Sequence, residues 1–107
     1  MRTKILIADD SKFMRSILKN TIEKSGNKEI FEASNGRETI NKYFELNPDL
    51  VFLDIVMPDV DGLETLKEII KKDKNAKIVI CSSNTQPMIK DEALKAGAAH
   101  FITKPFN

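Results

Sequence analysis

The sequence contains few of the residues that several classes of protein depend on. It has one cysteine, no tryptophan and one tyrosine among 107 residues. Because Cys81 has no second cysteine to pair with, an internal disulfide is excluded, which fits a reducing compartment. No apolar run approaches the roughly 20 residues of a membrane-spanning helix, and the short apolar run near the N-terminus ends in acids, unlike a signal peptide. We expect a small cytoplasmic domain outside the membrane.

The chain also lacks an excess of charge of either sign. Its 17 basic and 16 acidic residues leave a net charge of +1, so no global field favours nucleic acid or an anionic membrane. Neither G-x-x-x-x-G-K nor G-x-G-x-x-G occurs, which excludes the usual nucleotide cradles. The length suits one hydrophobic core and is too short for two. We therefore expect residues 1–107 to form one domain that does not bind nucleic acid directly.

Short apolar runs alternate along the chain with amphipathic segments. Continuous runs, as in strands that are buried on both faces, lie at Ile5–Ala8, Leu50–Leu53 and Ile78–Cys81, and two further short strands are predicted at Ile30–Ala33 and Phe101–Thr103. Apolar residues spaced by three and four predict helices over Phe13–Ile22, Thr39–Leu46, Leu63–Ile70 and Met88–Ala96. This strict alternation predicts an α/β fold, a doubly wound parallel five-stranded sheet with four helices on its two faces.

Polar residues follow four of the predicted strands. Asp9 and Asp10 follow the first strand, Asp54 the third, Ser82 the fourth and Lys104 the fifth. Taken singly, each is a common turn, cap or surface residue. Taken together, they are hard to explain by turn preference, because lysine has no special role in turns. Ligands of open parallel sheets bind beyond the carboxyl ends of the strands, so a site is expected there.

The chemistry of this group of residues points to phosphoryl transfer. Close carboxylates repel one another and need a counter-charge. An all-oxygen set without histidine or cysteine suits Mg²⁺. A lysine and a serine hydroxyl can bind phosphoryl oxygens, and a carboxylate can itself be the nucleophile that forms an aspartyl phosphate. Without a nucleotide cradle, the expected donor is a phosphorylated protein or a small phosphodonor.

The motifs at these strand ends resemble those of response-regulator receiver domains, most nearly the CheY-like chemotaxis regulators. The resemblance runs in order from Lys4 to Phe106 and implies a flavodoxin-like sheet with strand order 2-1-3-4-5. It rests on Ile7-Ala8-Asp9-Asp10, Leu53-Asp54-Ile55-Val56-Met57-Pro58 with Asp61-Gly62, Cys81-Ser82-Ser83, Lys95-Ala96-Gly97-Ala98 and Lys104-Pro105-Phe106.

The resemblance implies a role for each residue of the acidic group. Asp54 would accept the phosphoryl group and would also be a ligand of Mg²⁺. Asp10 would bind the metal directly and Asp9 mainly through water, while the backbone carbonyl of Val56 would complete the protein ligands.

Three further residues match the phosphate-contacting and switch positions of the family. Ser82 matches the switch Ser/Thr, Lys104 the phosphate-contacting lysine and Phe101 the aromatic switch residue on the fifth strand. Many members have tyrosine where this chain has Phe101, so rotation of the ring is expected to persist without a hydroxyl contact to a partner. Asn84 and Val56 match positions that tune the lifetime of the phosphoryl group.

The resemblance also implies partners and leaves alternatives open. A histidine kinase would supply the phosphoryl group, and an output protein would recognise the surface of the fourth helix and fifth strand. The domain would be a signalling module and not an enzyme with turnover. It would act alone or as the N-terminal receiver of a longer regulator with a DNA-binding or enzymatic output. A Mg²⁺-dependent phosphohydrolase is disfavoured, because Val56 stands where such enzymes usually place a second acid. A flavodoxin-like cofactor binder is disfavoured by Asp9 and Asp10, which would repel a phosphate.

Receiver domains usually continue past the position of Phe106 into a fifth helix, which this chain lacks. That helix normally covers one face of the sheet beside the first helix. We therefore expect the apolar sides of the first strand, the fifth strand and the first helix to be partly open. An exposed apolar patch of this kind favours association. The chain is therefore expected to be a piece of a longer protein, a naturally short variant, or a protomer whose missing cover comes from another chain through self-association.

Overall fold

The computed structural model describes residues 2–83 and 86–104, and it confirms the predicted alternation of strands and helices. Each predicted element is present, with bounds that differ from the expected ones by a few residues. In chain order the elements are β1 (Thr3–Ala8), α1 (Lys12–Glu23), β2 (Lys28–Ala33), α2 (Gly36–Leu46), β3 (Leu50–Asp54), α3 (Gly62–Lys72), β4 (Ile78–Ser82), α4 (Pro87–Lys95) and β5 (His100–Thr103).

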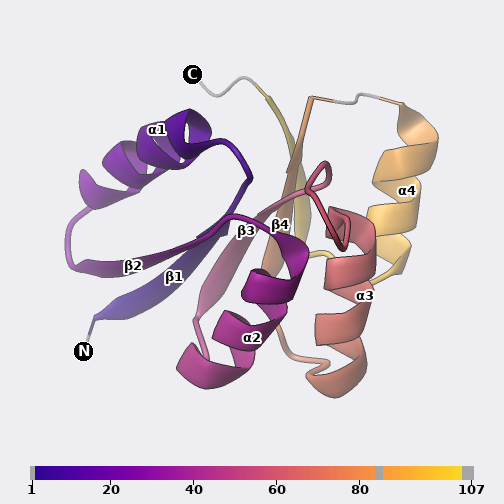
Figure 1. The fold of residues 1–107 in the computed structure, drawn as a ribbon, viewed down its shortest axis with the longest axis horizontal. Helices are drawn as coiled ribbons and strands as arrows, with labels where there is room; N and C mark the ends of the chain where they lie inside the picture. Colours follow the sequence, from indigo (N-terminus) through magenta and orange to yellow (C-terminus); the bar gives the residue numbers. More distant parts are fainter. Residues whose placement is uncertain (1, 84–85, 105–107) are drawn as a thin grey trace.

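The five strands form one parallel sheet in the order β2-β1-β3-β4-β5. Figure 1 shows α1 on one side of this sheet and α2, α3 and α4 on the other. The flavodoxin-like doubly wound fold with strand order 2-1-3-4-5 is therefore confirmed. Since all strands point the same way, the residues after β1, β3, β4 and β5 meet at one edge.

Local sequence signals fix several of the helix ends. The hydroxyl of Ser11 accepts the Met14 N–H at 3.2 Å and caps α1. Asn47 ends α2 in the left-handed conformation, with φ 50°, directly before a proline. Pro87 occupies the first turn of α4, where its missing N–H costs nothing. Gly97 follows that helix with φ 113°, a conformation that favours glycine.

The hydrophobic core is formed by the central strands and by the inner faces of the helices. Leu6, Leu53, Leu66 and Ile80 are fully buried on the side of α2 and α3. The expectation that the first strand is partly open is wrong, because all of Ile5–Ala8 is at most 3% exposed. Residues of α1 cover the other side of this strand, where Ile7 shares a small cavity with Met14 and Leu18.

The openness expected of the first helix and the fifth strand is confirmed. No residue of α1 is fully buried, and the side chain of Phe13 is 72% exposed. Ile102 of β5 is 37% exposed. Ile102 pairs with Cys81, which lines the cavity beneath α1. Because paired residues of parallel strands point to the same face, Ile102 lies on the α1 side of the sheet.

Some of the predicted features lie outside the described residues. These are Asn84 and the last two residues of the final motif, Pro105 and Phe106. In the part of the chain that the structure describes, we find no helix with the length and apolar character needed to cross a membrane.

Candidate functional site

The three aspartates predicted from the sequence lie together at the carboxyl edge of the sheet. Asp54 is the last residue of β3, and Asp9 and Asp10 directly follow β1. One carboxylate oxygen from each lies within 4.8 Å of the others. Asp9 and Asp54 are buried, at 6% and 7% exposure, whereas Asp10 faces solvent. The site therefore has a desolvated floor and one solvent-facing acid.

Lys104, which directly follows β5, brings a positive charge into this group. Its Nζ lies 2.6 Å from Asp9 Oδ2 and 3.3 Å from Asp54 Oδ1, and its side chain is 13% exposed. Its backbone N–H donates to the carbonyl of Ser82 at 2.8 Å, so the pairing of β5 with β4 directs the lysine toward the acids. The ammonium thus bridges two carboxylates that would otherwise repel each other.

Burial and charge shift the pKa values of these groups. Burial, followed by the negative charge of Asp9, raises the pKa of Asp54, although Lys104 and the Val56 N–H act in the opposite direction. Burial opposes the charged form of Lys104. The hydrogen bond that Lys104 donates to Asp9 and the charges of Asp54 and Asp9 outweigh it, so the pKa of Lys104 is raised. Lys104 therefore remains a cation in the site at neutral pH, held by two carboxylates.

Two residues that sequence reasoning did not assign to the site hold Asp9 in place. The N–H of Ser11 donates to Asp9 Oδ1 at 2.9 Å, and Arg15 Nη1 donates to the Asp9 carbonyl at 2.5 Å. Arg15 Nε also binds Glu32 of β2 at 2.9 Å. Because Glu32 lies on another element, no local spacing in the sequence indicates this pairing. Asp9 is therefore held by the Ser11 N–H within its own turn and by Arg15, which is itself fixed by Glu32 of β2.

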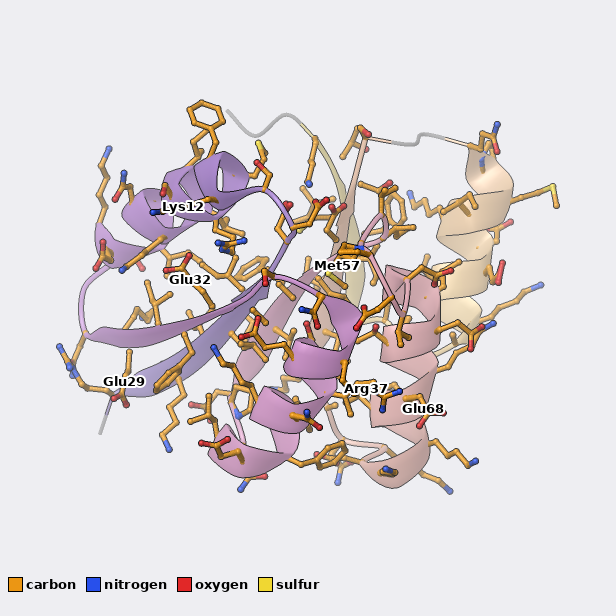
Figure 2. All side chains as sticks on the ribbon, viewed as in Figure 1. Lys12, Glu29, Glu32, Arg37, Met57 and Glu68 are labelled. Atoms are coloured by element: carbon orange, nitrogen blue, oxygen red, sulfur yellow. The ribbon has the colours of Figure 1, made fainter. Side chains whose placement is uncertain are left out.

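The loop between β3 and α3 brings backbone groups to Asp54. The Val56 N–H donates a hydrogen bond to the Asp54 carboxylate, while the Val56 side chain is 68% exposed. The next side chain, Met57, is buried in the core and lies near the centre of the view in Figure 2. The loop closes where the Gly62 N–H donates to the Ile55 carbonyl at 2.7 Å. The Val56 side chain therefore faces solvent, and the backbone N–H of Val56 is the group that contacts Asp54.

Gly62 is required at its position by close packing. A Cβ atom there would lie 2.1 Å from the carbonyl oxygen of Asp54 and 2.5 Å from the Cα of Ile55. Both contacts are with backbone that cannot move aside easily. The glycine of the Asp61-Gly62 motif thus lets α3 begin directly against the residue that carries the central carboxylate.

Ser82 and Phe101, the two remaining predicted residues, lie at different distances from the carboxyl edge of the sheet. Ser82 ends β4 one residue beyond Cys81, which is paired with Asp54, and it is 1% exposed. Phe101 pairs with Ile80, two residues before Ser82, and packs against the core. The structure thus brings Ser82 to the edge that holds the acids and Lys104, whereas Phe101 lies below that edge and does not line the group.

Comparison with known proteins places this arrangement in a family. The model of the response regulator receiver domain matches residues 5–107. The chemotaxis protein CheY of Thermotoga maritima is 51% identical over 106 residues, which is 99% of this chain and 88% of the relative. The chain belongs to the receiver domain family. It is a CheY-like receiver domain of the chemotaxis type.

Solved structures agree with this assignment of the receiver domain. The response regulator domain of Thermotoga maritima CheB is 39% identical, with a TM-score of 0.91. The match covers 100% of this chain and 81% of the CheB domain. CheY in the CheX–CheY–BeF₃–Mg²⁺ complex of Borrelia burgdorferi matches 98% of this chain and 80% of its own, at 36% identity and a TM-score of 0.91.

The side chains at the edge of the sheet fit a magnesium ion. The group holds three carboxylates and one ammonium, which contacts two of them, so two negative charges remain without a counter-charge inside the group. A dication would balance them. All of the side-chain donors are oxygens, which Mg²⁺ prefers, and the exposed Asp10 leaves room for the waters that this ion keeps. Among the described residues, no other group of acids, histidines or cysteines has this geometry.

Proposed function

We propose that this receiver domain is a phosphoacceptor switch in which Asp54 accepts a phosphoryl group from a histidine kinase. The single observation that carries the proposal is the position of the Asp54 carboxylate. It is buried at the carboxyl end of β3, and Lys104 contacts both this carboxylate and a second buried acid. A nucleophile, a cation and a set of oxygen donors are thus within reach of one phosphoryl group.

Asp10, Asp9, the Asp54 carboxylate and the Val56 backbone carbonyl would hold Mg²⁺, with Asp9 acting mainly through water. When bound, the ion would neutralise charge on the transferring phosphoryl oxygens. An oxygen of Asp54 would attack the phosphorus of the phosphohistidine. The phosphorus–nitrogen bond breaks, and the imidazole nitrogen leaves with the electron pair and takes up a proton. Lys104 would bind a phosphoryl oxygen.

The switch follows from the new charge on Asp54. A phosphoryl group there would attract Lys104 and the hydroxyl of Ser82 at the end of β4. This would pull the loop after β4 inward and let Phe101, which is now half-buried, bury further. The surface of α4 and β5 would change as a result, and the output protein would recognise that surface. Phosphorylation therefore acts by shifting the population of two conformations.

Further parts of the proposal concern the partners and the setting. The domain would act in the cytoplasm and catalyse only its own phosphorylation and dephosphorylation. It would associate with itself through the open side of α1 and β5, where Phe13 and Ile102 are exposed. The alternative is the receiver part of a longer regulator. The similarity to the response regulator domain of CheB supports that alternative.

The proposal is tested by phosphorylating the wild type and the Asp54→Asn variant with acetyl phosphate and Mg²⁺. We expect one labelled site in the wild type and complete loss of labelling in the variant, because the amide is not a nucleophile. The Asp73→Asn variant is the matched control, since Asp73 lies outside the acidic group, and it is expected to label normally. Retained labelling of Asp54→Asn would exclude Asp54 as the acceptor, and labelling that is unaffected by removal of Mg²⁺ would exclude the metal site.

A further inference from the structure

The loop between β3 and α3 is attached to a second helix as well as to its own. Asp59 lies in this loop, three residues after Val56, and its carboxylate accepts the N–H of Gly36 at 3.0 Å and the N–H of Arg37 at 3.3 Å. These are the first two residues of α2. Figure 1 shows the loop beside the ends of α2 and α3 that lie nearest to the carboxyl edge of the sheet.

The two N–H groups that Asp59 binds have no acceptor within their own helix. The first four N–H groups of an α-helix need partners from outside the helical hydrogen-bond pattern. Asn35 satisfies a third, because its side chain accepts the Glu38 N–H at 2.8 Å, and the regular helical bonds begin with the Thr39 N–H, which donates to the Asn35 carbonyl at 3.0 Å. Asp59 therefore completes the cap of α2, and its negative charge lies at the positive end of the helix dipole.

Asp59 has an unusual backbone conformation for this contact. Its φ is +64°, a left-handed value that disfavours residues other than glycine, asparagine and aspartate. The loop also packs directly on α2. A Cβ atom on Gly36 would lie 2.1 Å from the carbonyl oxygen of Val60. The backbone at Asp59 and Val60 is thus pressed against the start of α2 and held there by the carboxylate.

The same loop carries the backbone of Val56, whose N–H donates to Asp54. One end of the loop is closed by the bond from the Gly62 N–H to the Ile55 carbonyl. That bond leaves the segment from Val56 to Asp61 to be positioned by other contacts. The buried side chain of Met57 is one of them, and the bonds of Asp59 to α2 are another.

We propose that Asp59 is a positioning residue of the metal site, holding the loop on α2 so that the Val56 carbonyl can serve as a magnesium ligand. This inference rests on the proposed function, because it requires a magnesium site at Asp9, Asp10 and Asp54. Asp59 itself does not touch the metal or the phosphoryl group. It acts through the path of the loop, as residues around the ligands of a metal commonly do.

The test is titration of the whole chain with Mg²⁺ alone, followed by calorimetry and by the NMR shift of the Asp10 amide. In Asp59→Gly the carboxylate is lost, but the left-handed backbone becomes free of strain, so the variant is expected to fold. We expect its affinity for Mg²⁺ to fall about tenfold. Asp59→Asn keeps an acceptor oxygen and tolerates the same backbone conformation, so it is expected to retain most of the affinity.

The matched control is Asp73→Ala. Asp73 accepts a hydrogen bond from the Tyr43 hydroxyl at 2.6 Å and so joins α2 and α3 at their other ends, away from the loop. This variant has no side-chain acceptor and loses that contact between the helices, and its affinity for Mg²⁺ is expected to equal that of the wild type. An equal loss of affinity in Asp73→Ala would show that helix packing in general, and not Asp59, controls the site.

The outcomes separate this inference from the proposed function. If the wild type binds Mg²⁺ and folded Asp59→Gly binds it equally well, Asp59 does not position the site, and the phosphoacceptor assignment is untouched. If the wild type does not bind Mg²⁺, the magnesium site itself is wrong. Should Asp59→Gly fail to fold, Asp59→Ala decides, because it also removes the acceptor of the Gly36 and Arg37 N–H groups, and unchanged affinity for Mg²⁺ in that variant would contradict the proposal.

Discussion

Lys104 contacts both of the buried carboxylates in the site. Its ammonium compensates two buried carboxylates, at 2.6 Å from Asp9 and 3.3 Å from Asp54, with its side chain almost removed from solvent. A buried charge without a partner is costly, whereas the same charge in a hydrogen-bonded group is tolerated. The stability of the domain without metal therefore depends on this lysine, and a bound dication would replace part of its contribution.

We expect Lys104→Met to lower the free energy of unfolding by about 3 kcal/mol in the absence of Mg²⁺, because Asp9 and Asp54 are left without a counter-charge. Adding excess Mg²⁺ should recover part of this loss. Urea unfolding with and without the ion measures both effects. Lys67→Met is the control, since Lys67 and Glu92 form an exposed pair at 3.4 Å that is expected to contribute less than about 1 kcal/mol. Equal effects of the two substitutions would contradict this account of Lys104.

At the scale of the elements, α2 and α3 are joined at both ends. Asp59 holds the start of α2 from the loop that precedes α3, and the Tyr43 hydroxyl of α2 donates to Asp73 just after α3. Between these ties, Arg37 and Glu68 line the same groove between the helices, and Figure 2 shows them near each other. The pair of helices therefore forms one layer on which the loop between β3 and α3 rests.

The hydrogen bond from Tyr43 to Asp73 makes the stability of this layer decrease at alkaline pH. Burial, followed by the hydrogen bond and charge of Asp73, raises the pKa of Tyr43 above its ordinary value of 10.0. The folded state holds the phenolic proton of Tyr43 more tightly than the unfolded state does. The contribution of this group to stability is therefore complete below pH 10 and is lost as the pH rises above 10. The chain has no other tyrosine, so the effect has one phenolic source.

We expect Tyr43→Phe to lower the free energy of unfolding at neutral pH by about 1.5 kcal/mol, the contribution of a hydrogen bond to a charged group. Above pH 10 the difference from the wild type should shrink, since the wild type loses the same interaction there. Urea unfolding at several pH values measures this. Parallel pH profiles of the two proteins would show that Tyr43 does not titrate with folding.

At the scale of the whole molecule, the two faces of the sheet are covered unequally. Three helices lie on one side, with fully buried residues in each of them, whereas α1 lies on the other side and has none. Phe13 and Ile102 are exposed on this second side. Exposed apolar residues on the less covered face of a sheet favour association with another surface.

Self-association through this side predicts that the apparent mass rises with protein concentration in sedimentation experiments. Phe13→Ser removes the most exposed aromatic ring of α1 and is expected to shift the protein toward monomer. Met88→Ser is the control, because Met88 of α4 is 82% exposed on the other side of the sheet. A wild type that remains monomeric at every concentration would contradict the proposal.

The sequence predicted the fold and most of the site for identifiable reasons. Continuous apolar runs mark the strands of a parallel sheet, and Ser11, Asn47 and Pro87 mark helix ends by local chemistry. The contacts of Arg15 with Asp9 and Glu32 and those of Asp59 with α2 were not predictable. Each joins residues on different elements, and no pattern of local spacing records such pairs.

By itself, the sequence determined the order of strands and helices and the residues that follow each strand, because both depend on local periodicity and turn chemistry. Only the tertiary structure decided that Lys104 lies nearer to Asp9 than to Asp54, and that α1 buries the first strand. It also decided that Asp59 caps a neighbouring helix. These features depend on distances between side chains on different elements, which exist only once the sheet and its helices have packed.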